Sequence, residues 1–283
     1  MAPSDLPLSS IPVTVMIFTL NEEMHLPKCF QSLAWCDDVI VVDSFSHDRT
    51  EEICRSMGGR FFQHPFTGFG DQRTWALENT APKHEWVLIL DADERVTGAL
   101  ATELALTLSS VPESVGGFRL KRRFHMWGRW LRYSSLYPSW VVRLVRKGRV
   151  RYINRGHAET QDVIGEVRDL KSDLIDENLK GIDEWFDRQN RYSRKEAEYE
   201  LAVDSQPLRL RDVMSGNPLV RRKIMKRLAT KSPARPLIYF LYSYFWRRGF
   251  LDGKDGLVFC VMRALYQGMV ASKKHDLRRR PNR

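Results

Sequence analysis

The chain has 283 residues, of which 43% are hydrophobic, so it is long enough for one large globular domain or for one domain with an extension. Its four cysteines form no C-x-x-C pair, which argues against a disulfide framework or a zinc site and favours a reducing cytosol. The first ten residues contain no basic segment and no long apolar run, so we expect no signal peptide.

The net charge of +10 is unevenly distributed along the chain. Residues 206–283 contain 19 Lys/Arg and 4 Asp/Glu, a net charge of +15, whereas the preceding residues have a net charge of −5. This asymmetry is typical of a protein whose basic part meets a polyanion. For the C-terminal part we therefore expect either nucleic acid or an anionic membrane surface as the partner.

Short apolar runs alternate with amphipathic segments over the first hundred residues. The runs predict buried strands at residues 11–18, 39–42, 60–63 and 86–90. The intervening segments predict three helices: one with an apolar stripe at Leu26, Phe30 and Leu33, one ending at Gly58-Gly59, and one ending near Asn79. Strand–helix–strand alternation implies right-handed crossovers, and so an α/β fold with a mostly parallel central sheet.

Polar residues follow three of these strands, at Thr19–Glu22, Asp43–Ser44 and Asp91–Asp93. Because ligands of open α/β sheets bind at the carboxyl ends of the strands, we expect the three clusters to converge on one edge. Asp91 and Asp93 supply the oxygen ligands that a hard divalent cation prefers beside a diphosphate. An isolated Asp-x-Asp is also a common loop sequence, so the convergence is what favours a metal–diphosphate site.

The second half of the chain is less regular. Strands are expected at residues 117–123 and 139–145, extended and looped chain at 152–166, and a charged helix at 182–203. Residues 124–140 are rich in aromatic side chains and arginine, which suits either a ligand-binding groove with aromatic stacking faces or ordinary loop packing.

Four motifs of the first hundred residues carry a resemblance to a known family. They are Thr19-Leu-Asn21-Glu22, the run from Val41 to Thr50, Gly68-Phe-Gly-Asp-Gln72-Arg73 and Leu90-Asp91-Ala-Asp93-Glu94. In this order and spacing, residues 11–100 resemble the nucleotide-sugar half of family 2 glycosyltransferases with the GT-A fold. The bacterial lipopolysaccharide-core and exopolysaccharide enzymes are the most similar type, and Arg191-Tyr-Ser-x-x-Glu-Ala197 and Gly249-Phe-Leu-Asp-Gly253 extend the similarity.

The resemblance implies a GT-A catalytic domain at residues 1–205, with a nucleotide-sugar half at 11–100 and an acceptor half at 101–205. Residues 206–283 would form a basic helical extension that associates with membranes. The chain has no Gln-x-x-Arg-Trp and no bundle of spanning helices, so a processive synthase is not expected.

The resemblance also implies roles for individual residues. It places a divalent cation, Mg²⁺ or Mn²⁺, on Asp93 with Asp91, and lets Asp91 contact the ribose or nucleotide instead. It assigns the nucleotide-sugar, as a UDP-sugar, to Thr19, Asn21, Glu22, Asp43, Arg73 and Asp91. Asp43-Ser44 replaces the acidic pair found in many relatives, so Asp43 or the backbone must contact the base. The alternatives are helix capping by Thr19 and Asn21, a turn role for Asp43, and solvation of Arg73.

Inversion at the anomeric carbon needs a base that takes the proton of the acceptor hydroxyl. Glu159 is the predicted catalytic base, because relatives have a carboxylate near this position. His157, Asp162 and Glu166 are the neighbouring alternatives.

The predicted function is that of an inverting glycosyltransferase, of the hexosyltransferase type, which adds one sugar to a lipopolysaccharide-core or lipid-linked saccharide. Residues 236–246 and 257–270 are too short to span a bilayer and predict interfacial helices on anionic lipid, or a core hairpin. We therefore expect a cytoplasmic protein, peripheral on the inner face of the membrane, that does not bind nucleic acid. A basic nucleic-acid- or lipid-binding protein without transferase activity, a degenerate transferase, or another nucleotide-sugar enzyme are the alternatives.

Overall fold

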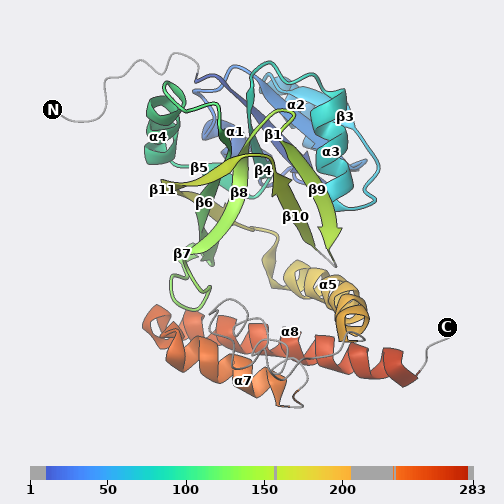
Figure 1. The fold of residues 1–283 in the computed structure, drawn as a ribbon. Coiled ribbons are helices and arrows are strands. Elements are labelled where there is room, and N and C mark those ends of the chain that lie inside the picture. Colours follow the sequence, from blue (N-terminus) through green and yellow to red (C-terminus); the bar gives the residue numbers. More distant parts are fainter. Residues whose placement is uncertain (1–10, 156–157, 205–231, 233, 280–283) are drawn as a thin grey trace. The chain divides into compact units, whose positions relative to one another are not determined.

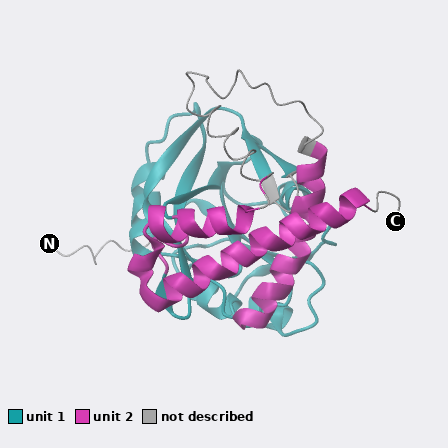
Figure 2. Cartoon of the chain, turned by 90° about the horizontal axis from the view of Figure 1, so that it is seen from below, with its two compact units in different colours: residues 1–130, 137–154, 158–179 teal, residues 131–136, 155–157, 180–283 magenta. Residues whose placement is uncertain are grey.

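The computed structural model describes residues 11–155, 158–204, 232 and 234–279, which belong to two compact units (Figure 2). Unit 1 comprises residues 1–130, 137–154 and 158–179, and unit 2 comprises residues 131–136, 155–157 and 180–283. The predicted boundary between residues 205 and 206 lies outside the described residues and stays a prediction.

Unit 1 is built on a nine-stranded sheet with the order β3-β2-β1-β4-β8-β6-β11-β5, in which β7 pairs with β6 (Figure 1). A separate two-stranded sheet contains β9 and β10. The strands are β1 (Val13–Thr19), β2 (Val39–Asp43), β3 (Arg60–Gln63), β4 (Trp86–Asp91), β5 (Glu94–Val96), β6 (Val115–Met126), β7 (Arg129–Trp130), β8 (Ser139–Arg146), β9 (Val150–Arg155), β10 (Ala158–Val163) and β11 (Glu166–Glu177). The helices are α1 (Leu26–Gln31), α2 (Thr50–Ser56), α3 (Phe69–Asn79) and α4 (Gly98–Leu108).

The strands β3, β2, β1 and β4 are parallel, as the alternation of strands and helices predicts. Their register sets Thr19 beside Asp43 and Phe18 beside Asp91, so the three polar clusters do meet at one edge of the sheet. The second half adds antiparallel pairs, because β8 runs against both β4 and β6, and β5 runs against β11. The β6–β11 pair is again parallel.

The sheet is covered on both faces, which explains why its central strands are apolar throughout. Val13, Val15 and Ile17 of β1 face a core formed with α1, α2 and α4. Met16 and Phe18 face a second core that includes Ala76 of α3 and Tyr152 of β9. Full burial of one such side chain contributes about 1.5–3 kcal/mol, so the two cores hold the strand ends in place.

The described part of unit 2 is mainly helical, and the helices predicted for the basic extension at residues 206–283 are present from Arg235 to Arg279. It contains α5 (Gly181–Asp204), α7 (Arg235–Leu241), a π-helix η2 (Tyr242–Trp246), a 3₁₀ helix η3 (Gly249–Asp252) and α8 (Gly253–Arg279). Ala197 of α5 packs on Tyr266 and Val270 of α8. The carboxylate of Glu200 in α5 accepts from Arg235 at 2.9 Å and from Lys274 at 3.1 Å, which ties the three helices together.

No helix in the described part of the chain is long and apolar enough to cross a membrane.

The short segment Leu131–Leu136, between β7 and β8, belongs to unit 2 although both of its neighbours in the chain belong to unit 1. Its anchor is Asp252, a buried residue of η3. One carboxylate oxygen of Asp252 accepts from the backbone N–H of Tyr133 at 2.9 Å, from the N–H of Ser134 at 2.8 Å and from the Ser134 hydroxyl at 2.7 Å. The Gly249-Phe-Leu-Asp252-Gly253 sequence thus fixes the loop at Leu131–Leu136.

Candidate active site

The ends of β1 and β2 are joined through a buried carboxylate. Asp43 accepts from the Thr19 hydroxyl at 2.7 Å through one oxygen and from the Ser46 N–H at 2.7 Å through the other. The Asp43 side chain is fully buried, so no part of it faces solvent. Asp43 therefore has the turn role given above as an alternative, and its hydrogen bonds hold the loops after β1 and β2 together.

Asn21 makes the second connection between these loops. Its backbone has a φ of 56°, a left-handed conformation that Asn tolerates better than most residues. Its N–H donates to the Ser46 hydroxyl at 2.7 Å, and its side-chain oxygen accepts from the His47 N–H at 2.8 Å. Neither Thr19 nor Asn21 caps a helix. The four residues predicted for the nucleoside, Thr19, Asn21, Glu22 and Asp43, are brought together in this region.

Asp91, at the end of β4, is held by two guanidinium groups. Arg73 donates to one oxygen at 3.0 Å and Arg143 to the other at 2.5 Å. The surrounding protein raises the pKa of Asp91, but Arg143 and Arg73 outweigh this effect and keep the pKa well below its ordinary value. Asp91 is thus ionised, and the 36% of its side-chain surface that is exposed to solvent favours the same state.

Arg73 is buried, which rules out the solvated alternative. Its guanidinium lies 5.3 Å from the ring centre of Phe18 and 5.5 Å from that of Phe69. It projects from α3, whose start is the Gly68–Arg73 motif. A Cβ on Gly68 would lie 2.7 Å from the amide group of Asn154 in β9, so a larger residue there would require that side chain to move.

Glu94 turns inward beneath Asp91 and is fully buried. One oxygen accepts from Arg143 at 2.7 Å, and the other accepts from the Asp91 N–H at 2.9 Å. Burial raises the pKa of Glu94 to about 7, while the charge of Arg143 acts in the opposite direction. Arg122, from β6, lies 3.6 Å from Glu94 and 3.2 Å from Asp176 of β11. These groups form one ionic network under the strand end.

Asp93 differs from Asp91 because no arginine is paired with it among the described contacts. Burial, together with the nearby carboxylates of Asp176, Asp91 and Glu22, raises the pKa of Asp93 to about 6. The Asn178 amide lies 3.3 Å from one Asp93 oxygen, and the Asp93 carbonyl accepts from the Glu177 N–H at 2.9 Å. Carboxylates therefore dominate the electrostatic surroundings of Asp93, while His25 acts in the opposite direction.

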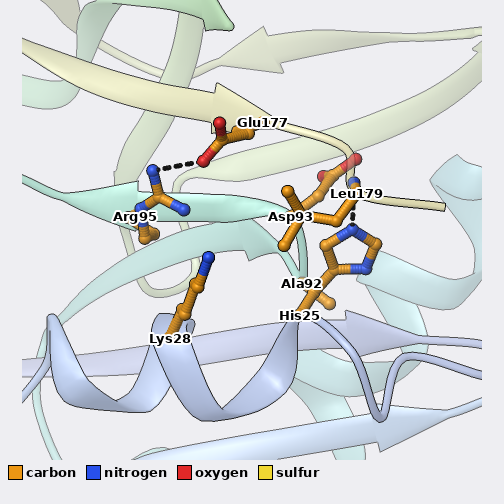
Figure 3. Close-up of a pocket in the computed structure, with 7 residues that line it drawn as sticks. All are labelled: His25, Lys28, Ala92, Asp93, Arg95, Glu177 and Leu179. Carbon is orange, nitrogen blue, oxygen red and sulfur yellow. Dashed lines mark hydrogen bonds and ion pairs between the residues drawn. The ribbon is translucent and has the colours of Figure 1, made fainter. Parts of the chain in front are cut away.

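A small pocket lies beside Asp93 (Figure 3). Its lining comes from the start of α1, the β4–β5 turn, β5 and the chain at the end of β11, and consists of His25, Lys28, Ala92, Asp93, Arg95, Glu177 and Leu179. The buried His25 ring is fixed at both nitrogens. Nδ1 lies 2.6 Å from a Glu22 oxygen, and Nε2 accepts from the Leu179 N–H at 2.7 Å, so His25 holds the end of β11 against α1.

The structure treats the four candidates for the base differently, and Asp162 is exposed on β10. Glu159 belongs to β10, but its side chain lies outside the described part of the structure, as does the whole of His157. Glu166 is exposed, pairs with Arg168 at 2.9 Å and begins β11. Asp176 lies ten residues further along that strand, beside Glu94. At about 3.3 Å per residue, Glu166 is about 30 Å from the Asp93 cluster, too far for a base there.

The aromatic segment at residues 124–140 is only partly exposed. Trp130 packs against Tyr137 and lies 4.9 Å from the Arg123 guanidinium. Trp140 lies under Arg119 and Lys121, and 38% of its surface is exposed. The structure thus shows packing of aromatic rings on cations, and an acceptor role for this segment stays a prediction.

The described residues include no group of three or more His, Cys, Asp or Glu side chains arranged to hold a metal ion. The predicted arrangement uses one or two carboxylates together with donor phosphates, so it is not tested by this finding.

Sequence reasoning missed Arg143, Arg122, Asp176 and His25. A signal existed for Arg143, because it is a charged residue inside the strand-like run Val141-Val-Arg-Leu-Val145, and it is almost fully buried. A buried arginine requires an acidic partner, and the sequence offers Asp91 and Glu94 at the end of the neighbouring strand.

Residues 14–171 match the model of Glycosyl transferase family 2, and the chain belongs to this family. It is 28% identical to the lipopolysaccharide core biosynthesis glycosyltransferase LpsC of Rhizobium meliloti (strain 1021), over 97% of both chains. It is 24% identical to an uncharacterized glycosyltransferase, RT0209, of Rickettsia typhi, over 94% of this chain and 87% of that one.

The fold is similar to that of the mannosyltransferase PcManGT from Pyrobaculum calidifontis, solved in complex with GDP-Man and Mn²⁺. The TM-score is 0.54 at 14% sequence identity, and the match covers 93% of this chain and 87% of that one. The predicted GT-A fold and the predicted enzyme class are therefore confirmed.

Proposed function

We propose that this glycosyltransferase moves a single sugar, with inversion, from a UDP-sugar to a lipopolysaccharide-core or lipid-linked saccharide. The observation that carries the proposal is the contrast between the two acids of the Asp91-Ala-Asp93 sequence. Asp91 is neutralised by Arg73 and Arg143, whereas Asp93 has a raised pKa among other carboxylates. An uncompensated carboxylate at the carboxyl end of a parallel strand is the group that a cation would neutralise.

The residues present fit a hard divalent cation, Mg²⁺ or Mn²⁺, because the donors are carboxylate oxygens. Asp93 would hold it, with Asp91 as the second candidate. The ion supplies Lewis-acid stabilisation of the leaving diphosphate. The mannosyltransferase of similar fold was solved with Mn²⁺ and a nucleotide-sugar, which supports the proposal.

The nucleoside pocket is proposed at Thr19, Asn21, Glu22 and Asp43. The Asp43 carboxylate accepts hydrogen bonds from Thr19 and Ser46, so we propose that it fixes the loop whose backbone contacts the nucleobase. Arg73 is proposed at the diphosphate, where it orients Asp91 at the same time.

The acceptor is proposed to be lipid-linked, with the protein at the inner face of the cell membrane. The near full-length similarity to LpsC supports a lipopolysaccharide-core acceptor. The net charge of +15 in residues 206–283 favours an anionic surface.

Donor binding tests this proposal directly. The melting temperature is measured with UDP-, GDP-, dTDP- and CMP-sugars, each with and without Mn²⁺. We expect a Mn²⁺-dependent rise of about 5 °C or more with a UDP-sugar at about 100 times its Kd, because a ligand that binds only the folded state stabilises it. Stabilisation by DNA, with no effect of any nucleotide-sugar, would instead support a nucleic-acid-binding protein.

Glu159→Gln tests the proposed base. We expect kcat to fall by about 10²–10⁴-fold with little change in donor binding, because the amide cannot take the acceptor proton. Glu166→Gln is the matched control and should retain transfer, since Glu166 lies at the far end of β11. Full turnover by Glu159→Gln would contradict the assignment and make Asp176 the next carboxylate to replace.

A further inference from the structure

Exposed apolar side chains are concentrated in one stretch of unit 2. Of the 23 large hydrophobic side chains exposed in the described structure, 12 lie between residues 237 and 265. They are Leu237, Ile238, Leu241, Tyr242, Phe245, Trp246, Phe250, Leu251, Leu257, Val258, Val261 and Leu265. We call this set the docking face.

The spacing of these residues shows that each helix exposes one apolar side. Leu237, Leu241 and Phe245 follow at intervals of four, and so do Leu257, Val261 and Leu265. Residues at this interval lie on the same side of a helix. α7 and α8 pack against each other (Figure 1), and Met262 and Tyr266 of α8 are buried. The two helices therefore pack against each other, and each of them also exposes an apolar side to solvent.

The turn between the helices joins the two exposed sides. Tyr244 contacts the rings of both Phe245 and Phe250, at centroid distances of 5.1 and 6.2 Å, which links η2 to η3. At this turn Trp246 has 80% of its surface exposed, the highest value among these side chains. Soluble monomers rarely expose a contiguous apolar patch larger than a few hundred Å². We therefore expect a partner to cover the docking face.

The charges around the docking face identify the occupant. Arg247 and Arg248 follow Trp246 directly, and Lys254 is exposed at the start of α8. Of the two acids in residues 236–265, Asp252 is buried against the Tyr133–Ser134 backbone. Exposed aliphatic and aromatic side chains beside basic ones are typical of a helix that lies in the interface of an anionic bilayer.

We propose that the docking face inserts into the headgroup and upper acyl region of an anionic lipid bilayer, with Trp246 at the point of entry. The inference rests on the proposed function for the lipid-linked nature of the acceptor, and it assigns the membrane contact to apolar insertion by the α7–α8 turn. The basic residues beside the turn orient it and add attraction to anionic headgroups. Binding should therefore persist at high salt, in contrast to a purely electrostatic tail.

The test is sedimentation of the full chain with vesicles of phosphatidylcholine, alone or mixed with phosphatidylglycerol. Phe245→Ser with Trp246→Ser should lower the partition coefficient at least about tenfold on both vesicle types, because apolar area no longer enters the bilayer. Leu106→Ser is the matched control, since Leu106 is exposed on α4 of unit 1. Arg247→Gln with Arg248→Gln should weaken binding only to the phosphatidylglycerol vesicles.

Unchanged vesicle binding by the Phe245/Trp246 variant, with an unchanged melting temperature, overturns the proposal. So does a wild-type dimer that this variant dissociates without any vesicle binding, because the docking face would then pair two copies. Quenching of tryptophan fluorescence by brominated lipid is the second measurement, and it should be reduced in Trp246→Phe. The Mn²⁺-dependent effect of the UDP-sugar should be the same in all variants, so failure of the donor site and failure of the docking face are distinguishable.

Discussion

Asp93→Asn is expected to lower the kcat of sugar transfer by about 10³-fold, which corresponds to several kcal/mol of lost stabilisation of the leaving diphosphate. The amide keeps the size of the side chain but removes the charge that a divalent cation needs. It also removes the repulsion from Asp176, Asp91 and Glu22, so the melting temperature without ligand should not fall. Kinetics at saturating donor and Mn²⁺, together with the melting curve, separate these two effects.

Asp37→Asn is the control for this experiment. Asp37 lies just before β2, at the opposite end of the strand from Asp43, and pairs with Lys83 and His84. This variant should retain transfer. Wild-type turnover by Asp93→Asn would remove the proposed cation site, whatever the stability of the protein.

Arg143→Met is expected to lower the free energy of unfolding by about 3–5 kcal/mol, because it leaves the buried Glu94 and the strand-end Asp91 without their shared cation. Arg146→Met is the matched control on the same strand. Arg146 is equally buried, but its partner Glu85 has 61% of its side chain exposed and can be solvated. The measurement is urea unfolding of both variants beside the wild type, and equal losses would show that the network contributes nothing specific.

The loss in Arg143→Met should also depend on pH. Burial already raises the pKa of Glu94 to about 7, and removal of Arg143 raises it further. An acid whose pKa is higher in the folded state than in the unfolded state lowers the free energy of unfolding as the pH rises from the unfolded pKa to the folded pKa. The difference in stability between variant and wild type should therefore narrow from pH 8 to pH 6. A difference that widened toward pH 6 would contradict the assigned pairing of Arg143 with Glu94.

The parallel half of the sheet could be predicted because its signal is local. β3 occupies residues 60–63 as predicted, and β4 exceeds its predicted range by Asp91 alone. These strands are buried on both faces, so each is an uninterrupted apolar run between polar loops. The convergence of Thr19, Asp43 and Asp91 then follows from topology.

β11 could not be predicted in the same way, because its sequence is strongly charged. Its carboxylates are neutralised by basic residues of the neighbouring strand, as in the pairs Arg119–Asp169 and Arg123–Asp173. Cross-strand pairing of this kind is visible only once the two strands are adjacent. α4 was missed although Thr97 caps it, with an oxygen 3.1 Å from the Leu100 N–H.

In the candidate site, too, some features could be predicted from local sequence and others depend on contacts between distant segments. The sequence indicated where the polar groups gather. Which of these groups form hydrogen bonds or ion pairs with one another depends on distances that only the structure gives. Asp43 is committed to Thr19 and Ser46, and Asp91 to Arg73 and Arg143, so Asp93 is distinguished only by its surroundings. The roles of Glu159 and of the other proposed residues stay predictions.

The anchoring of Leu131–Leu136 by Asp252 has a consequence for how this family can diversify. The segment Leu131–Leu136 lies between β7 and β8 of unit 1 in the sequence, but it packs with the C-terminal helices of unit 2. A foreign set of helices without a carboxylate at the position of Asp252 would leave the Tyr133 and Ser134 amides without their acceptor. Natural recombination or a deliberate exchange of C-terminal parts between relatives must therefore carry this six-residue loop along with the helices.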